Sequence, residues 1–479
     1  MIKTAIISAT LATMIVAAAC GSSPSSPDAT TPGDTPTGSD AVLVDAASIP
    51  IATFDRFGST NNEEALRVTV DAAGNSFIMG FTRGPIDLGG GIRDARTDQE
   101  QIWVASYTSD GRHRWSHVLA RTSPINAASW TVGDICGDGV GGAWLAVVPS
   151  GSISVAGTAV NFAENRRGVV LAHLDSTGAL AYVETSTTSV ASVGTHVEIA
   201  PAPNRGVYMA LTLGFGESVV GGISIRGSPG PWHIARIGGD GRAAWVEPVL
   251  NGEVQALASN EGGLLVVLGT FRREVGFGGA SVTKATDNNS PFLLRIPPTT
   301  VMAATGLAIE ICATCFTQIN EDSRMDLTVR TDETVAAVWQ VANQTGGLFY
   351  SVGRFNADGT RPWTTAPSDG WRIFGVAFAD ETVAVVGRSN GVGNVANHVA
   401  DGAVGMLRVE LSAQTGAIDQ WTTSPSSIEF DTQFADGWYD IASTAVGWVA
   451  VGRFTGPVQF GGQTLTSVGS DAVVARIPR

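Results

Sequence analysis

Cysteine, histidine and charge are all scarce in this chain. Its 479 residues include four cysteines and six histidines, and only 15% of the residues are charged. Four cysteines are too few to hold such a fold by disulfides, and a chain this long can bury a large core without them. The 44 acidic residues outnumber the 29 basic ones, which gives a formal net charge of −15. Because acidic surfaces repel phosphate backbones, we expect no nucleic-acid partner.

Motifs of common catalytic sites are also missing. The sequence contains no G-x-S-x-G, no H-E-x-x-H, no phosphate-binding P-loop and no EF-hand loop. The segment GDGVGG, residues 137–142, has the glycine spacing of a dinucleotide site, but the strand-like run AWLAVV follows where a helix would have to begin. His113 and His117 are four residues apart, but no further metal ligands accompany them. We therefore expect a tight turn at 137–142, no cofactor, no metal ion and no catalytic residue set.

The first 40 residues differ from the rest of the chain. Residues 1–19 combine Lys3 with a short apolar run that ends in three alanines, which are the features of a secretory signal peptide. Residues 21–40, GSSPSSPDATTPGDTPTGSD, carry no large apolar side chain and predict a disordered tether. The folded domain is expected at residues 41–479, where no apolar run is long enough for a membrane helix.

Cys20 lies between these two segments, in the sequence IVAAACGSS at 15–23. This sequence resembles the lipobox of bacterial lipoproteins. The resemblance implies cleavage before Cys20 and acylation of this residue by chains such as palmitate, which would anchor the protein to the cell envelope. Ser22 stands where members retained at the inner membrane often have Asp, so the resemblance implies the outer membrane, with the domain facing the periplasm or the surface. The alternative is a plain secreted protein with an incidental cysteine.

A repeated pattern covers the remainder of the chain. Residues 66–119 alternate strand-like runs with turn signals in the order strand, tight turn, strand, long loop, strand, Asp-Gly turn, strand. The first strand of this pattern recurs seven times, near Leu66, Thr131, Val197, Val254, Met325, Arg372 and Trp438. Four short strands per repeat are typical of propeller blades. We therefore predict an all-β fold, a single β-propeller of seven four-stranded blades.

The last repeat ends at DAVVARIPR, after its third strand. The N-terminal segment IPIATFDRFGS, residues 49–59, would supply the missing fourth strand, with Phe54 near the position that is aromatic in other repeats. Pairing the two ends would close the ring and cover both exposed sheet edges.

Two family resemblances accompany the repeats. VDAAGNSFIMG at 70–80, FGG at 277–279 and 460–462, and DAVVARI at 471–477 resemble the SBBP-type β-propeller repeats of bacterial surface lipoproteins. LDSTGALAY at 174–182 and LSAQTGAIDQW at 411–421 look like the docking motif of quinoprotein propellers, which packs blades together and by itself implies no quinone.

The long loops, which alternate with the tight turns, are where binding is expected on a rigid scaffold. Three tryptophans near the starts of inner strands could stack a sugar or anchor a partner, or could instead pack between blades. The candidate binding residues are Trp130, Trp371, Trp438, Arg93, Arg166, Trp232 and His398.

The remaining cysteines suggest a structural role. Cys312 and Cys315, in the sequence CATC, are expected to form a local disulfide, because the envelope is oxidising. Two free thiols, or a bond from one of them to Cys136, remain alternatives. Cys136 itself lies on an apolar strand, where we expect a buried thiol.

These features favour an envelope lipoprotein whose propeller is a non-catalytic binding or scaffold module for a protein or glycan partner. One alternative is an envelope enzyme, either acting on glycans or a quinoprotein-like oxidoreductase; a carboxylate pair at the channel mouth would favour glycan cleavage. Another is a structural envelope protein that assembles with copies of itself, which concentration-dependent assembly would reveal.

Overall fold

The computed structural model describes residues 53–59, 61–95, 99–120, 131–149, 151–162, 168–187, 197–212, 216–227, 232–284, 288–309, 325–342, 348–365, 371–390, 394–395, 398–399, 404–425, 436–460 and 463–478. The chain divides into two compact units, Met1–Asp45 and Ala46–Arg479, and all described residues belong to the second. No helix in these ranges is both long enough and apolar enough to span a membrane.

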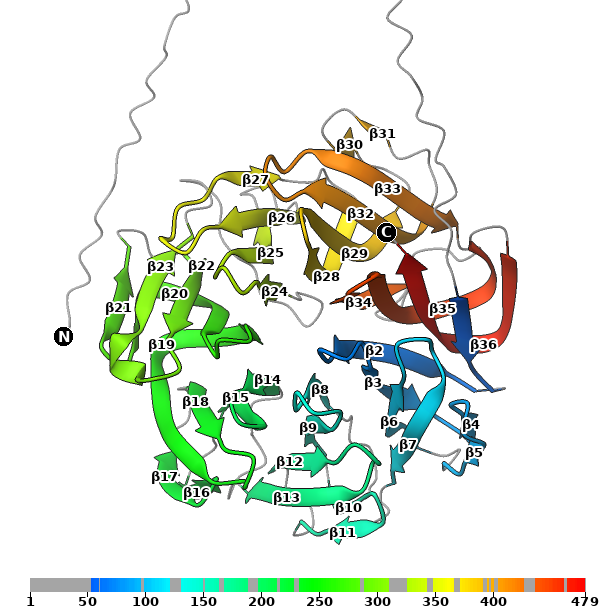
Figure 1. Cartoon of the computed structure of the whole chain (residues 1–479), viewed down its shortest axis with the longest axis horizontal. Helices are drawn as coiled ribbons and strands as arrows, with labels where there is room; N and C mark the ends of the chain where they lie inside the picture. The colour runs from blue at the N-terminus through cyan, green and yellow to red at the C-terminus, as the bar shows by residue number, and fades with distance from the viewer. Residues whose placement is uncertain are drawn as a thin grey trace, which may run out of the picture. The chain divides into compact units, whose positions relative to one another are not determined.

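The described fold is all-β, as predicted, with small antiparallel sheets arranged like the blades of a propeller (Figure 1). The first sheet contains β2 (Glu63–Val70), β3 (Ser76–Thr82), β6 (Gln101–Tyr107) and β7 (His113–Leu119). The second contains β8 (Thr131–Gly137), β9 (Ala143–Val148), β12 (Gly168–Leu174) and β13 (Leu180–Thr187).

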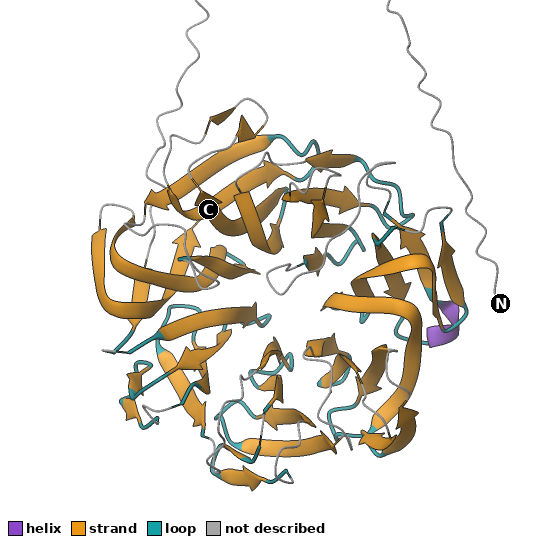
Figure 2. Ribbon diagram, turned by 180° about the vertical axis from the view of Figure 1, so that it is seen from behind, coloured by secondary structure: helices purple, strands orange, loops and turns teal. Residues whose placement is uncertain are grey.

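An eight-stranded sheet follows, because the long strand β19 continues from one group of strands into the next. Its strands are β14 (Val197–Ala202), β15 (Gly206–Thr212), β18 (Trp232–Ile237), β19 (Ala243–Ser259), β20 (Leu265–Phe277), β21 (Ala280–Thr283), β22 (Ser290–Ile296) and β23 (Thr305–Ala308). A short 3₁₀ helix, η1 (Val301–Ala303), precedes β23 and is seen from behind in Figure 2.

Three further sheets complete the arrangement. One contains β24 (Asp326–Val329), β25 (Val335–Ala342), β26 (Leu348–Phe355) and β27 (Trp363–Thr365). The next contains β28 (Trp371–Ala379), β29 (Thr382–Asn390), β32 (Val404–Ser412) and β33 (Ile418–Pro425). The closing sheet contains β34 (Gly437–Thr444), β35 (Gly447–Phe460), β36 (Gln463–Pro478) and, from the other end of the described chain, β1 (Thr53–Phe57).

Two-stranded hairpins are inserted between the second and third strands of several repeats and lie at the outer rim (Figure 1). These hairpins are β4 (Ile86–Asp87) with β5 (Ile92–Arg93), β10 (Ile153–Val155) with β11 (Thr158–Val160), β16 (Gly216–Val220) with β17 (Ile223–Gly227), and β30 (Asn394–Val395) with β31 (His398–Val399). We call the side of the ring that carries these connections the long-loop side, and the opposite side, with the turns between first and second and between third and fourth strands, the tight-turn side.

The inner strands form a closed circuit. β2, β8, β14, β19, β24, β28 and β34 each contact the next, and β34 contacts β2. The middle strands are buried on both faces, as in β3, β6, β9 and β12, because each sheet packs against a neighbour on either side. This double burial explains why their sequences are continuously apolar rather than alternating.

The turns follow from their residues. Residues 138–142 form the tight turn predicted for GDGVGG, since β9 rather than a helix follows. Gly178 adopts a φ of +83° in the turn before β13, and a Cβ built on it would lie 2.7 Å from Cγ of Trp115 in the neighbouring sheet. Tyr182 packs on Gly241 and Trp363 on Gly416 in the same way. Each of these rings fills the joint between two sheets, the packing expected for the repeated aromatic.

β1 pairs antiparallel with β36 and supplies the fourth strand of the closing sheet. The sequence places Phe54 near the aromatic position, and in the structure Phe54 lies one residue from it. Phe54 stands opposite Ala475, and Thr53 stands opposite Arg476. In the first sheet Trp115 is opposite Ser106, which occupies the third-strand position that Arg476 has here. Thr53 therefore holds the place that is aromatic in some of the other sheets.

Candidate functional site

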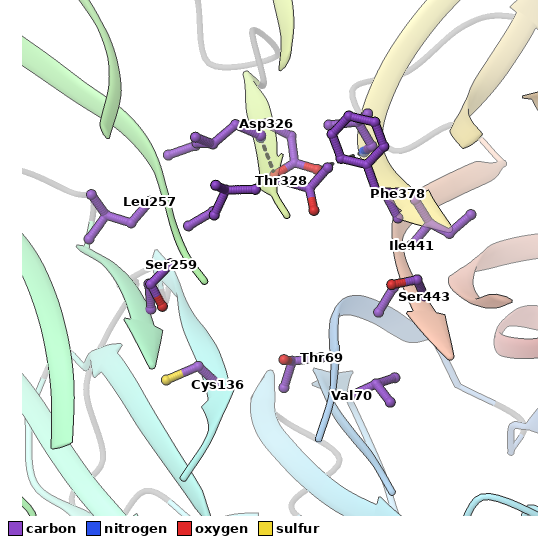
Figure 3. Close-up of a pocket in the computed structure, with 18 of the residues that line it drawn as sticks. Thr69, Val70, Cys136, Leu257, Ser259, Asp326, Thr328, Phe378, Ile441 and Ser443 are labelled. Carbon is purple, nitrogen blue, oxygen red and sulfur yellow. Dashed lines mark hydrogen bonds between the residues drawn. The ribbon is translucent and has the colours of Figure 1, made fainter. Parts of the chain in front are cut away.

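A cavity of about 660 Å³ lies at the centre of the ring, lined by the inner strands. Its walls run from the middle of these strands to their ends on the tight-turn side, where Asn260, Glu261, Arg330 and Asp380 stand. In Figure 3, side chains such as Thr69, Cys136 and Ser443 point around this hollow from different sheets. The cavity is central and lined by residues from several sheets, and it is therefore the first candidate for a binding site.

Five charged side chains line this cavity at the middle of the inner strands. They are Arg67 on β2, Asp134 on β8, Glu198 on β14, Asp326 on β24 and Asp440 on β34. One cation thus faces four carboxyl groups in a largely buried setting. We call these five residues the central cluster.

Three of the carboxylates accept backbone hydrogen bonds from two sheets at once. Asp134 accepts a bond from its neighbour Ile135 N–H (2.8 Å) and another from Ile199 N–H in the next sheet (2.9 Å). Asp326 does the same with Leu327 N–H (2.8 Å) and Val376 N–H (2.7 Å).

Asp440 repeats the pattern across the joint between the two ends of the chain. Its oxygens accept bonds from Ile441 N–H (2.8 Å) and from Val68 N–H in the first sheet (2.8 Å). In each case one carboxylate ties two neighbouring inner strands together, and both of its oxygens are occupied. We call these three residues the carboxylate clamps.

The remaining two members of the cluster form ion pairs. Arg67 Nη2 lies 3.4 Å from Glu198 Oε1, and Arg67 Nε lies 3.6 Å from Asp134 Oδ1. Arg67 thereby links the first sheet to the second and third strand groups around the centre. Removing one partner of such a buried pair is costly, because it leaves the other charge uncompensated.

Electrostatics within the cluster shift several pKa values. Burial opposes the charge on Arg67, but the carboxylates led by Glu198 and Asp134 outweigh it and raise the pKa of Arg67. Burial and the charge of Glu198 raise the pKa of Asp134 well above its ordinary value. Burial and the charge of Asp440 raise the pKa of Asp326 to about 8. Asp326 therefore holds its proton at neutral pH.

The cavity has limited means for chemistry. Its described lining contains no His, Tyr or Lys, and its acids are carboxyl groups and the thiol of Cys136. The oxygens of the three clamps already accept backbone bonds, which fixes their orientation toward the strands. No group of three or more His, Cys, Asp or Glu placed to hold a metal ion occurs within the described ranges.

Two predicted binding residues are buried between sheets. Trp371, the first residue of β28, is 3% exposed and packs with Ala336 and Tyr350 of the preceding sheet. Trp438 on β34 is also 3% exposed, and it belongs to a buried cluster that includes Ala384 and Met406 of the preceding sheet. This is the inter-blade packing that the sequence left open as the other role of these tryptophans.

Other candidates are dispersed. Trp232 begins β18 and is 6% exposed, whereas Arg93 lies on the rim strand β5 and donates from Nε to Ser116 Oγ (3.0 Å). The structure does not bring them together with the buried tryptophans. The candidates outside the described residues are Cys20, Trp130, Arg166, Cys312 and Cys315, together with the side chain of His398, whose backbone lies in β31.

Cys136 is confirmed as a buried free thiol on β8, 2% exposed beside the cavity. Burial raises the pKa of this thiol well above its ordinary value, so the reactive thiolate is suppressed.

The central cluster was missed by sequence reasoning, although a signal was present. An Asp followed by Ile or Leu recurs in the inner strands, as Asp134-Ile135, Asp326-Leu327 and Asp440-Ile441. A charged residue repeated at one place in an otherwise apolar strand indicates a structural or binding role there. Arg67 and Glu198 break this pattern, and their pairing depends on the ring geometry.

Comparisons with known proteins identify no family. A scan against models of protein families finds no match, and no curated protein matches the chain. Among solved structures, a protein of unknown function from Dyadobacter fermentans DSM 18053 has 10% identity, a TM-score of 0.38, and coverage of 90% of this chain and 100% of that one. A polysaccharide lyase of family PL25, an ulvan lyase bound to -[GlcA(1-4)Rha3S]-, has 9% identity, a TM-score of 0.42, and coverage of 88% and 96%. A mutant apocarotenoid oxygenase from Synechocystis has 13% identity, a TM-score of 0.32, and coverage of 76% and 96%. At these values none of the likenesses supports an activity for this chain.

Proposed function

We propose that this protein is a non-catalytic binding module of the bacterial cell envelope, in which a seven-bladed propeller presents its rim to a partner. The observation that carries the proposal is that the central carboxylates bind the protein's own backbone. In the central cavity, the three carboxylate clamps hold neighbouring inner strands together by accepting hydrogen bonds from backbone N–H groups. The oxygens of these three carboxylates therefore serve the scaffold.

The proposed count of seven blades rests on treating the eight-stranded sheet as two blades. β19 is 17 residues long, and its first half pairs with β18 while its second half pairs with β20. It would then serve as the fourth strand of one blade and the first strand of the next. The two halves, together with the five four-stranded sheets, make seven blades.

The envelope location rests on the lipobox-like sequence around Cys20 and the polar tether after it. Several acyl chains would make attachment nearly permanent, at ~0.8 kcal/mol for each buried CH₂. A tether of about 20 residues would leave the rigid domain free to meet partners.

The proposed binding face is the long-loop side, with its inserted rim hairpins. Ile92 on β5 is 72% exposed, and Val468 on β36 in the adjoining sheet is 81% exposed. Large apolar side chains held out on rigid hairpins favour a protein partner over a glycan, because protein interfaces bury such side chains at their centre.

A pull-down with matched surface variants tests this proposal. The bait is residues 41–479, crosslinked in envelope extracts of the source organism. The test variant carries Ile92→Ser and Val468→Ser, and the control carries Val140→Ser and Val446→Ser, which are 59% and 74% exposed in turns between first and second strands on the tight-turn side. We expect a specific protein to be captured by the wild type and the control and lost by the test variant.

Loss from the control alone would move the binding face to the tight-turn side and contradict the proposal. Capture of no protein, together with binding to purified envelope glycans, would replace the protein partner by a glycan. Turnover of such a glycan that is abolished by Asp326→Asn would show that the module is an enzyme.

A further inference from the structure

The central cavity is a pocket with a floor at the middle of the ring and an opening on the tight-turn side. Its lining on β2 and β34 begins at Arg67 and Asp440 and continues toward the tight turns. On the long-loop side of these residues, Leu66, Phe374 and Tyr439 from three sheets belong to one buried cluster, and the ring centroids of Phe374 and Tyr439 lie 5.9 Å apart. The central cluster therefore forms the floor of the cavity.

Two of the seven inner strands bring only a small residue to this floor. Gly375 precedes Val376 on β28 as Arg67 precedes Val68 on β2, and the N–H groups of Val376 and Val68 each donate to a carboxylate clamp. Ala256 follows a bulge on β19 at the register that Arg67 has on β2. The strands β19 and β28 stand on either side of β24 in the ring.

Asp326 on β24 is therefore flanked by small residues, and Figure 3 shows it across the hollow from Thr69 of β2 and Cys136 of β8. The floor has long side chains around Arg67 and short ones on both sides of Asp326. The free space of the floor thus lies beside this one carboxyl group.

Positive charge is also placed unevenly on the floor. The ion pairs of Arg67 join it to Glu198 and Asp134. Asp326 accepts two backbone hydrogen bonds, but it has no ion pair within the described ranges. Burial and the charge of Asp440 raise its pKa to about 8, and the distant Arg67 offsets this only in part. A cation beside Asp326 would supply the charge that its surroundings lack.

We propose that the central cavity binds a primary ammonium group beside Asp326, supplied either by a free small amine or by a lysine side chain of a partner. A carboxylate has about four acceptor positions on its two oxygens, so Asp326 can keep its two backbone bonds and accept from the ammonium as well. The excess of carboxyl groups on the floor disfavours an anion. The site is separate from the rim surface of the proposed function, and either can fail alone.

Binding of the amine should release a proton. A cation beside a carboxyl group favours its charged form, so Asp326, protonated at neutral pH in the free protein, ionises when the amine binds. The titratable and charged side chains that face the cavity from the other inner strands near the floor are Arg67, Asp134, Cys136, Glu198 and Asp440. The strands β19 and β28 add no titratable group to the floor. The affinity should therefore rise up to ten-fold per pH unit from about pH 6 to 8 and level off above 8.

Ligand-observed NMR titration of residues 41–479 at pH 6, 7 and 8 tests the proposal. The probe is n-butylamine, which stays charged in this range because alkylamines, like lysine, have a pKa of about 10.4. Its neutral and anionic comparators are 1-butanol and butyrate. We expect n-butylamine at pH 8 to bind at least ten-fold more tightly than 1-butanol, and butyrate to bind most weakly. Equal affinities for n-butylamine and 1-butanol, or no binding of n-butylamine at millimolar concentration, would overturn the proposal.

A blocked lysine, Nα-acetyl-lysine methylamide, distinguishes the two sources of the ammonium group. An affinity within five-fold of that of n-butylamine supports a lysine of a partner. A weaker affinity supports a free small amine, because the peptide groups then do not fit the cavity.

Matched variants locate the site. Asp326→Asn keeps the size of the side chain and removes its charge, and it should weaken n-butylamine binding at pH 8 at least ten-fold and abolish the rise with pH. Glu261→Gln is the control, because it removes a carboxylate from an exposed turn at the mouth of the same cavity, and it should change the affinity less than two-fold. Unchanged binding in a folded Asp326→Asn variant would overturn the proposal.

Calorimetry of the wild type keeps the proposal testable if Asp326→Asn does not fold. Titrations with n-butylamine at pH 6.5, in two buffers with different ionisation enthalpies, measure the number of protons released. We expect about one proton for each amine bound, as the raised pKa of Asp326 requires. Binding without proton release would remove Asp326 from the site and contradict the proposal.

Discussion

Replacing Asp440 by alanine should weaken the joint between the closing sheet and the first sheet. Asp440 accepts 2.8 Å hydrogen bonds from Val68 N–H and Ile441 N–H, and each such bond to a charged acceptor contributes about 1.5–3 kcal/mol. In the alanine variant, water that enters from the central cavity accepts hydrogen bonds from the two freed N–H groups, which offsets part of this loss. We expect a net loss of about 2–3 kcal/mol in the free energy of unfolding.

Urea denaturation of residues 41–479 measures this loss, and hydrogen exchange locates it. The Val68 amide should exchange at least ten-fold faster in Asp440→Ala, while the Ile199 amide, held by Asp134, should keep its rate. Glu261→Ala is the matched control, because Glu261 lines the same cavity but is exposed in a turn. A stability change below 0.5 kcal/mol with unaltered exchange at Val68 would refute the role assigned to the clamps.

Four further outcomes are expected. The pKa of the Asp326 carboxyl is about 8 in the folded protein and near 3.8 in the unfolded chain, so its contribution to stability should fall as pH rises from about 4 to 8. Urea denaturation at a series of pH values should therefore show a flatter pH dependence of stability in Asp326→Asn than in the wild type. The Cys136 thiol should resist alkylation in the native state and react fully in urea, as mapped by mass spectrometry; rapid native labelling would contradict its burial. Deleting residues 41–60 removes β1 and its ion pairs with β36, and should lower the melting temperature by several degrees; an unchanged melting curve would show that closure by β1 is dispensable. Cys20→Ser should move the full-length protein from the membrane fraction to the soluble fraction, and unchanged fractionation and processing would exclude the lipid anchor.

Much of the fold could be predicted from sequence because its signals are local. The turn 71–75 is determined by Asp71, whose Oδ1 accepts bonds from Ala73 N–H and Asn75 N–H. The glycines before the fourth strands recur because the turns need positive φ, as at Gly111 and Gly178. Each of these requirements involves a few neighbouring residues, which is why a strand-and-turn pattern could be recognised.

The candidate site was harder to predict because it depends on contacts between distant segments. Asp440 and Val68 are 372 residues apart, and only closure of the ring makes them neighbours. The candidate tryptophans show a second difficulty, because the same sequence position allows two different roles. A tryptophan at a strand start suits an exposed stacking surface and inter-sheet packing equally well, and burial of Trp371 decides between the two roles only once the neighbouring sheet is placed.

β1 shows the limit of pattern matching at the level of one residue. The sequence indicates that the N-terminal segment supplies a strand, but register depends on hydrogen bonding to β36. Thr53, rather than the adjacent Phe54, stands opposite Arg476.

The most direct test of the account compares the affinity of the captured partner for two variants, measured well below their melting temperatures. The account assigns binding to the rim and structural support to the centre. It predicts that Ile92→Ser with Val468→Ser weakens binding at least ten-fold, whereas Asp440→Asn changes it less than two-fold. Strong loss in Asp440→Asn, with full affinity in the rim variant, would place the site in the central cavity and contradict the account.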